Sequence, residues 1–113
     1  MITQKKITIP IFEYKLHIII FDKWKELDFI LDKDELEDVG SAITISNGGG
    51  AIIATNSKST DSIVHEAGHI KNAIWRYIGY EPMRDNDEVD QYLVAYIYNR
   101  IIEVYCKHNG IKQ

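Results

Sequence analysis

Residues 42–79 read AITISNGGGAIIATNSKSTDSIVHEAGHIKNAIWRYIG and contain both strand-like and helix-like patterns, from which the rest of the fold can be predicted. Two short runs rich in β-branched residues, Ala42–Ser46 and Ala51–Thr55, flank three consecutive glycines at 48–50. Such runs around a glycine turn predict a β-hairpin.

A helix should follow the hairpin directly. Ser59, Thr60 and Asp61 are each good N-cap residues. The apolar spacing predicts a helix that continues to Tyr77 or Ile78, where Gly79 supplies the left-handed C′ position.

A second helix is predicted beyond Pro82, with its cap among residues 85–87 (Asp, Asn, Asp) and its end near residue 108, just before Gly110. Apolar side chains recur there with the i, i+3, i+4, i+7 spacing of one helix face: Val89, Tyr92, Leu93, Tyr96, Ile97, Ile101, Val104 and Tyr105.

The first forty residues predict strands and a short helix. Residues 6–12 and 15–21 are β-prone, and Pro10 places the first of them at a sheet edge because proline cannot donate to a ladder. Residues 22–38 have the spacing of an amphipathic helix with an acidic outer face, which Gly40 should end. We therefore expect an α+β fold, a small antiparallel or mixed sheet followed by two packed helices.

Composition limits the class of protein. The 113 residues suit one domain, residues 1–113, and the single cysteine, Cys106, excludes a disulfide framework and a Cys-rich zinc module. A net charge of −4 argues against nucleic acid as the main partner, and no apolar run reaches the ~20 residues of a membrane span. Glu13, Lys15 and His17 interrupt what could be a signal peptide, so we expect a cytoplasmic protein.

One motif in the predicted helix carries chemistry. His65-Glu66-Ala67-Gly68-His69 is an H-E-x-x-H sequence, and residues four apart on a helix lie on one face, so both imidazoles can reach one ion. Glu66 would then lie beside the metal and accept a proton from metal-bound water. The alternatives are two solvated histidines, or a bound metal without catalysis.

A catalytic site needs a third ligand. The candidates are His17, His108 and the acids between residues 84 and 93, among which Glu88 is favoured and Asp90 is second. Asp85 and Asp87 look like capping residues, and all four acids also favour a helix N-terminus through its macrodipole.

These residues resemble the gluzincins, zinc peptidases with two histidines from H-E-x-x-H and a downstream glutamate. The length is similar to that of the single-domain minigluzincins. Glu88-Val-Asp-Gln-Tyr-Leu93 resembles a segment of peptidases that cleave repressors of phages and mobile elements. The chain also resembles small H-E-x-x-H proteins of phages and prophages. The resemblance covers roughly residues 43–100, and Ala67 and Lys71 depart from the usual pattern.

The resemblance implies Zn²⁺ as the cofactor, with His65, His69 and Glu88 as ligands and Glu66 as the general base. It also implies that a strand before the helix pairs with an extended peptide, either Ala51–Thr55 or, if the strand order differs, Ile43–Ser46. Larger relatives stabilise the oxyanion with a Tyr, His or Arg, and the candidates are Tyr77, Tyr80, Tyr92, Tyr96, Arg76 and Arg84. Core packing is the favoured role for Tyr92 and Tyr96.

Two functions compete at this point. The first is a zinc-dependent endopeptidase acting on a peptide or protein, including the cleavage of one regulatory protein. The second is a non-catalytic or weakly catalytic phage structural or assembly protein, virion-associated, that retains a zincin fold and metal site and forms homo- or hetero-oligomers through its last helix. The second function is suggested by a further apolar stripe on that helix, formed by Val94, Tyr98, Ile102 and Cys106.

Overall fold

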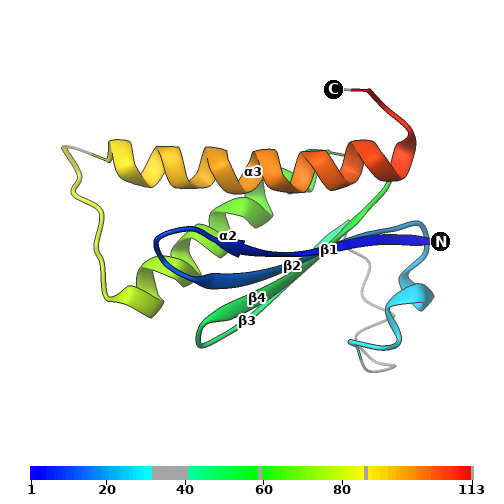
Figure 1. Cartoon of the computed structure of the whole chain (residues 1–113), viewed down its shortest axis with the longest axis horizontal. Coiled ribbons are helices and arrows are strands. Elements are labelled where there is room, and N and C mark those ends of the chain that lie inside the picture. The colour runs from blue at the N-terminus through cyan, green and yellow to red at the C-terminus, as the bar shows by residue number, and fades with distance from the viewer. Residues whose placement is uncertain (32–40, 59, 86, 113) are drawn as a thin grey trace.

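A computed structural model describes residues 1–31, 41–58, 60–85 and 87–112. Along the chain the elements are β1 (Ile2–Ile9), β2 (Tyr14–Phe21), the short 3-10 helix η1 (Trp24–Leu27), β3 (Ala42–Asn47), β4 (Gly50–Asn56), α2 (Asp61–Ile78) and α3 (Glu88–Asn109). The strands form one sheet in the order β1-β2-β4-β3, in which β2 and β4 are parallel and the outer pairs antiparallel. The α+β prediction is confirmed, with a mixed sheet and two helices (Figure 1).

The predicted hairpin is confirmed and its tip is tight. Asn47 lies opposite Gly50, so Gly48 and Gly49 alone make the turn, and Gly48 has φ +51°, a conformation that glycine adopts without strain. Because β4 pairs with β2 on its other side, β4 is an inner strand, and among the described strands β3 has β4 as its one neighbour.

Both predicted helices are confirmed, including their ends. Gly79 (φ +74°) and Gly110 (φ +69°) terminate α2 and α3 in the left-handed conformation, as expected for helix C-caps. Residues 79–87 lead from the end of α2 to the start of α3, and the two helices cross obliquely on one face of the sheet (Figure 1). Neither helix is long and apolar enough to cross a membrane.

The N-terminal strands differ from the prediction in their bounds. The first strand covers residues 2–9 instead of 6–12, and Pro10 lies in the turn that follows it. The edge position of this strand is confirmed. Ile11 in the turn has φ +72°, which a β-branched residue rarely adopts.

The prediction of a helix over residues 22–38 is wrong for residues 22–31, the part of this range that the structure describes. Only Trp24–Leu27 form a 3-10 helix, and residues 32–40 lie outside the described residues. The physical reason is burial, because Leu27 and Leu31 fold down onto Ile19 and Phe21 and cover one end of the outer sheet face. Phe21 and Trp24 meet ring to ring at 4.7 Å.

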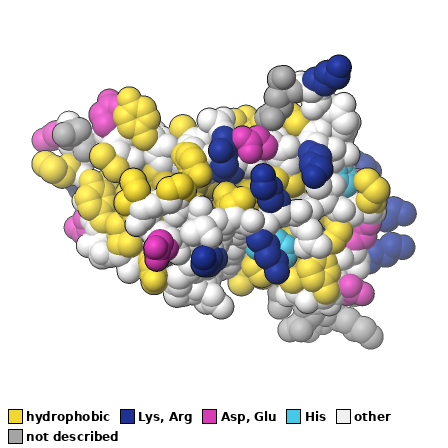
Figure 2. All heavy atoms as spheres, viewed as in Figure 1, with side chains coloured by type: hydrophobic (Ala, Val, Ile, Leu, Met, Phe, Trp, Pro, Cys, Tyr) yellow, Lys and Arg dark blue, Asp and Glu magenta, His cyan; other side chains and the backbone are white. Residues whose placement is uncertain are grey.

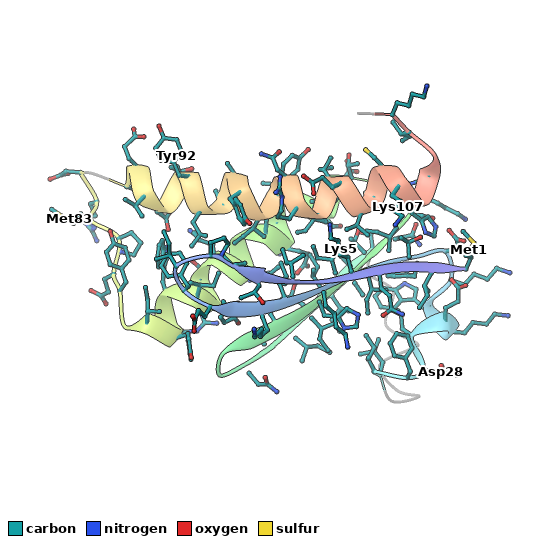
Figure 3. All side chains as sticks on the ribbon, viewed as in Figure 1. Met1, Lys5, Asp28, Met83, Tyr92 and Lys107 are labelled. Carbon is teal, nitrogen blue, oxygen red and sulfur yellow. The ribbon has the colours of Figure 1, made fainter. Side chains whose placement is uncertain are left out.

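The main core lies between the sheet and the helices. Its buried members alternate along β2 and β4 and recur on one side of each helix, and they include Leu16, Ile18, Ile53, Ile70, Ile74 and Ile97. Of the predicted α3 stripe, Leu93, Ile97, Ile101 and Val104 are buried. Val89 and Tyr92 are exposed, because the first turns of α3 extend past the sheet, and Tyr92 points away from it (Figure 3).

A polar cluster joins the ends of four elements, β1, β2, β4 and α3. Asp22 accepts hydrogen bonds from Ser57 Oγ (2.6 Å) and from His108 Nε2 (2.9 Å), and Thr3 Oγ1 lies 2.8 Å from His108 Nδ1. The Ser57 hydroxyl first, and His108 second, lower the pKa of Asp22 to about 2.

Candidate metal centre

The two histidines of the motif converge on the exposed side of α2. Their Nε2 atoms lie 3.0 Å apart and their ring centroids 4.5 Å apart. Two nitrogens at zinc–nitrogen distance around a tetrahedral ion are about 3.4 Å apart, so a widening of a few tenths of an ångström fits the pair to such an ion. The i, i+4 prediction therefore describes the observed geometry.

Glu66 lies beside the pair but is fixed from the sheet side. Its side chain is buried (8% exposed), and one carboxylate oxygen accepts a hydrogen bond from the Thr44 hydroxyl on β3. Ligand atoms of His65, Glu66 and His69 lie within 4.8 Å of one another, and among the described residues they form the one such group able to hold a metal. Imidazole and carboxylate are the donors that zinc takes in catalytic sites.

A cavity of about 320 Å³ opens between β3 and α2 at this point. It is lined by Ala42, Ile43, Thr44, Ser46, Glu66, His69 and Arg76. A second hollow of about 390 Å³ shares Ser46 and Arg76 with it and continues toward Tyr14 and Tyr77. The carboxylate and one imidazole thus face a groove along the outer strand.

The structure does not bring Glu88 to the histidine pair. Glu88 is exposed, and at 100° per residue it lies on nearly the opposite side of α3 from the buried positions Leu93 and Ile97. Its role as a ligand stays a prediction from the sequence.

Asp90, the second choice, has partners of its own. Its carboxylate accepts hydrogen bonds from Trp75 Nε1 (2.6 Å) and Lys71 Nζ (3.1 Å). Lys71 and Trp75 lie about 80–160° around α2 from the two histidines, so Asp90 faces a different side of that helix. This contact was not predicted from the sequence, although the i, i+4 spacing of Lys71 and Trp75 puts two hydrogen-bond donors on one face of α2.

The two remaining histidines also lie elsewhere. Both ring nitrogens of His108 are engaged by Thr3 and Asp22. His17 is on the outer face of the sheet, where its Nε2 lies 2.7 Å from Gln4 Oε1. Burial first, and the charge of Lys6 second, lower the pKa of His17.

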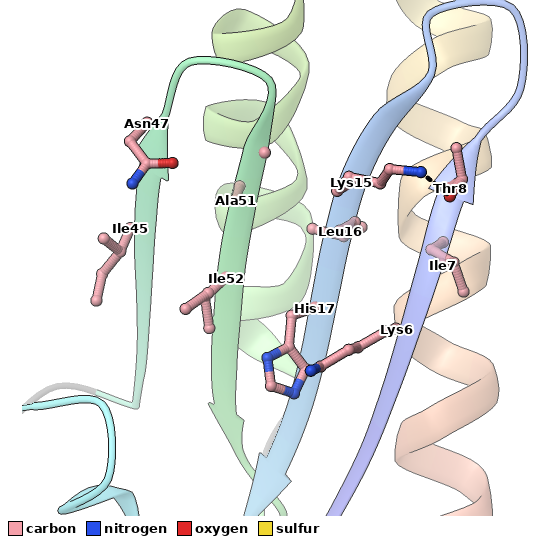
Figure 4. Close-up of a pocket in the computed structure, with 11 residues that line it drawn as sticks. Lys6, Ile7, Thr8, Lys15, Leu16, His17, Ile45, Asn47, Ala51 and Ile52 are labelled. Atoms are coloured by element: carbon pink, nitrogen blue, oxygen red, sulfur yellow. Dashed lines mark hydrogen bonds between the residues drawn. The ribbon is translucent and has the colours of Figure 1, made fainter.

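A further hollow of about 400 Å³ lies over that outer face (Figure 4). Lys6, Lys15 and His17 border it on one side and Ile45 and Ile52 on the other. The sheet separates this hollow from the metal group, because α2 packs on the opposite face.

The structure places the six candidates for oxyanion stabilisation in different parts of the molecule. Arg76 shares the cavity with Glu66 and His69, whereas Tyr80 packs on Trp75 with ring centroids 4.6 Å apart. Tyr96 packs against the core as expected, and Tyr92 does not, because it is 72% exposed. Tyr77 packs on Tyr14 at the far end of the groove, and Arg84 is exposed in the segment of chain that connects α2 to α3.

No family model, curated protein or solved structure matches this chain.

Proposed function

We propose that the protein is a zinc-dependent endopeptidase in which His65 and His69 hold the ion and Glu66 is the general base. Among the described residues, Glu66 is the one further residue whose ligand atom groups with the two imidazoles, so the third ligand expected from the sequence, Glu88, is not part of this proposal. The observation that carries this proposal is the group of two imidazoles and a buried carboxylate, with ligand atoms within 4.8 Å of one another. Glu66 and His69 of this group line a groove under an edge strand. The resemblance of the motif to gluzincins supports the same conclusion.

The chemistry follows from what each group can do. A bound zinc ion would polarise the peptide carbonyl and lower the pKa of water toward ~7. Glu66 accepts one proton from the attacking water as the carbon–oxygen bond forms. It then passes this proton to the leaving amine as the carbon–nitrogen bond breaks, so that one water is consumed for each bond cut.

Thr44 has a positioning role in this proposal. Its hydroxyl binds one oxygen of Glu66 and leaves the other for the proton transfer. It also ties the base to β3, the strand beside which a peptide would lie. The catalytic carboxylate and the peptide-binding edge are therefore held in fixed relation.

Substrate binding is supported by the backbone of β3. Ser41 C=O accepts from the Asn56 amide, and antiparallel alternation then turns the N–H and C=O groups of Ala42, Thr44 and Ser46 outward. An extended peptide can pair with these groups as an added strand. This choice corrects the expectation for Ala51–Thr55, since β4 is an inner strand, and favours Ile43–Ser46 instead.

The test compares Glu66→Gln with the wild type on casein and on quenched fluorescent peptides after zinc loading. Removal of a general base should lower turnover about 100- to 10,000-fold while bound zinc stays at the wild-type level. Glu81→Gln, an exposed change of the same kind in the connection between the helices, should leave turnover unchanged. Equal turnover of Glu66→Gln and wild type would remove the mechanism.

An assembly protein is the second candidate, favoured by one observation. Ile11, Val89 and Tyr92 are 93%, 57% and 72% exposed. They border one apolar hollow between the β1–β2 turn and the start of α3, where hydrophobic side chains gather (Figure 2). The stripe predicted for contacts is less available, because Val94, Tyr98 and Ile102 pack partly on the core. A ring or obligate complex in sedimentation, with no cleavage, would favour this function.

A further inference from the structure

Strand β3 and helix α2 form the two walls of the groove beside the metal group, and they meet at three positions along it. The hydroxyls of Ser41 and Ser62 hydrogen-bond at one end, and Thr44 binds Glu66 in the middle. At the other end a Cβ on Gly49 would lie 3.2 Å from the Tyr77 hydroxyl oxygen. From Ser62 to Tyr77 the helix rises about 22 Å, close to the ~20 Å from Ser41 to Asn47 along the strand, and Gly49 lies in the turn just beyond Asn47. Strand β3 and helix α2 therefore run side by side in the same direction.

Arg76 lies in this groove on the same stripe of α2 as the histidines. At 100° per residue, positions 65, 69 and 76 fall within about 40° of one another, and Arg76 stands about 10 Å beyond His69 along the axis. It lines both the cavity with Glu66 and the next hollow with Tyr77. Its charge also reaches Tyr14, where it opposes the rise in pKa that burial gives to that hydroxyl.

The guanidinium of Arg76 has no acidic partner within residues 1–31, 41–58, 60–85 and 87–112. This contrasts with Lys71 on another side of the same helix, which pairs with Asp90. The chain has 17 acidic residues against 13 lysines and arginines, so acids are not scarce. A guanidinium in a groove, without such a partner, fits a carboxylate by two parallel hydrogen bonds.

We infer that Arg76 selects peptides that carry a carboxylate about three residues from the bond lying over His65 and His69. An extended strand advances about 3.3 Å per residue, so three residues cover the ~10 Å between His69 and Arg76. The inference rests on the proposed function for the position of the cleaved bond. It adds the substrate class, an extended acidic peptide, and the residue that recognises it.

The experiment measures binding separately from cleavage. Fluorescein-labelled pools of randomised ten-residue peptides, amidated at the C-terminus, carry Glu, Gln or Lys fixed at one position in turn. Fluorescence anisotropy with zinc-loaded Glu66→Gln protein gives affinities without turnover. We expect Glu at one position to bind about tenfold more tightly than Gln there, and Lys to bind worse than Gln. Pools with a free C-terminus show whether a carboxylate at the end of the peptide binds as tightly as a glutamate side chain.

Three variants assign the effect to Arg76. Arg76→Gln in the Glu66→Gln protein should bind the Glu and Gln pools equally, and Arg76→Glu should prefer Lys. Lys107→Gln, an exposed helical position that also loses one positive charge, should keep the tenfold preference for Glu. Far-ultraviolet circular dichroism checks that each variant is folded.

The outcomes separate this inference from the proposed function. Cleavage by the wild type with no preference for Glu, or a preference that survives Arg76→Gln, overturns the role of Arg76 and leaves the peptidase standing. Binding of Glu pools through Arg76 without any cleavage by the wild type removes the peptidase and keeps the acidic-peptide groove. Absence of binding to every pool overturns the inference.

Discussion

Replacement of Asp90 by alanine tests whether this acid belongs to the fold or to the metal site. Asp90 is 6% exposed and accepts a buried hydrogen bond of 2.6 Å from Trp75 Nε1, together with the ammonium of Lys71 at 3.1 Å. A hydrogen bond to a charged group contributes about 1.5–3 kcal/mol, and the variant leaves the indole N–H of Trp75 unsatisfied. The Lys71 side chain, 18% exposed, loses a pairing of about 1 kcal/mol or less.

The expected loss of unfolding free energy is therefore about 3 kcal/mol, which for a domain of this size lowers Tm by about 12 °C. Urea unfolding followed by tryptophan fluorescence measures it. Asp87→Ala is the matched control, because Asp87 has the same macrodipole environment at the start of α3 but only an exposed contact to Gln91. Zinc affinity of Asp90→Ala, measured at a temperature where the variant is folded, should equal that of the wild type.

Two results would refute this reasoning. If Asp90→Ala loses no more stability than Asp87→Ala, the macrodipole alone explains the acid at position 90. If the folded variant loses zinc, Asp90 is a ligand and not a structural residue. A double-mutant cycle with Trp75→Phe should give a coupling of about 1–2 kcal/mol, since phenylalanine keeps an aromatic ring but lacks the N–H, and the cycle subtracts the packing that the smaller ring loses.

Three further changes have defined outcomes. Glu88→Ala should bind zinc as tightly as the wild type by competition with a chromogenic chelator, because its side chain faces outward; a tenfold loss would restore the ligand set predicted from the sequence. The folded pKa of Asp22, about 2 against 3.8 unfolded, gives stability that is present above pH 3.8 and lost as the pH falls to about 2. Asp22→Asn should therefore be less stable than wild type in thermal melts at pH 6 and equally stable near pH 2, and a difference that persists at pH 2 contradicts this assignment. Ile11→Gly should raise the unfolding free energy by about 1 kcal/mol in urea titrations by relieving φ +72°, whereas a loss would show that the side chain is needed.

The features that sequence reasoning placed correctly are local in origin. Gly79 and Gly110 end the helices through their own φ angles, and Gly48 turns the hairpin for the same reason. The i, i+4 spacing of His65 and His69 puts both imidazoles on one face of α2, where their Nε2 atoms lie 3.0 Å apart. These geometries need no distant contact, so the sequence determined them by itself.

The tertiary structure decided what depends on distant partners. Strand order makes β3 an edge and buries β4, which transfers the expected peptide edge from residues 51–55 to 43–46. It also gives Glu66 its contact with Thr44 and places Arg76 in the groove of the candidate metal centre. Similarly, residues 24–27 form one 3-10 turn because burial against Phe21 outweighs a helical spacing. Helical periodicity identifies the side of a helix that is buried, but the element that covers it depends on the packing of segments far apart in the chain.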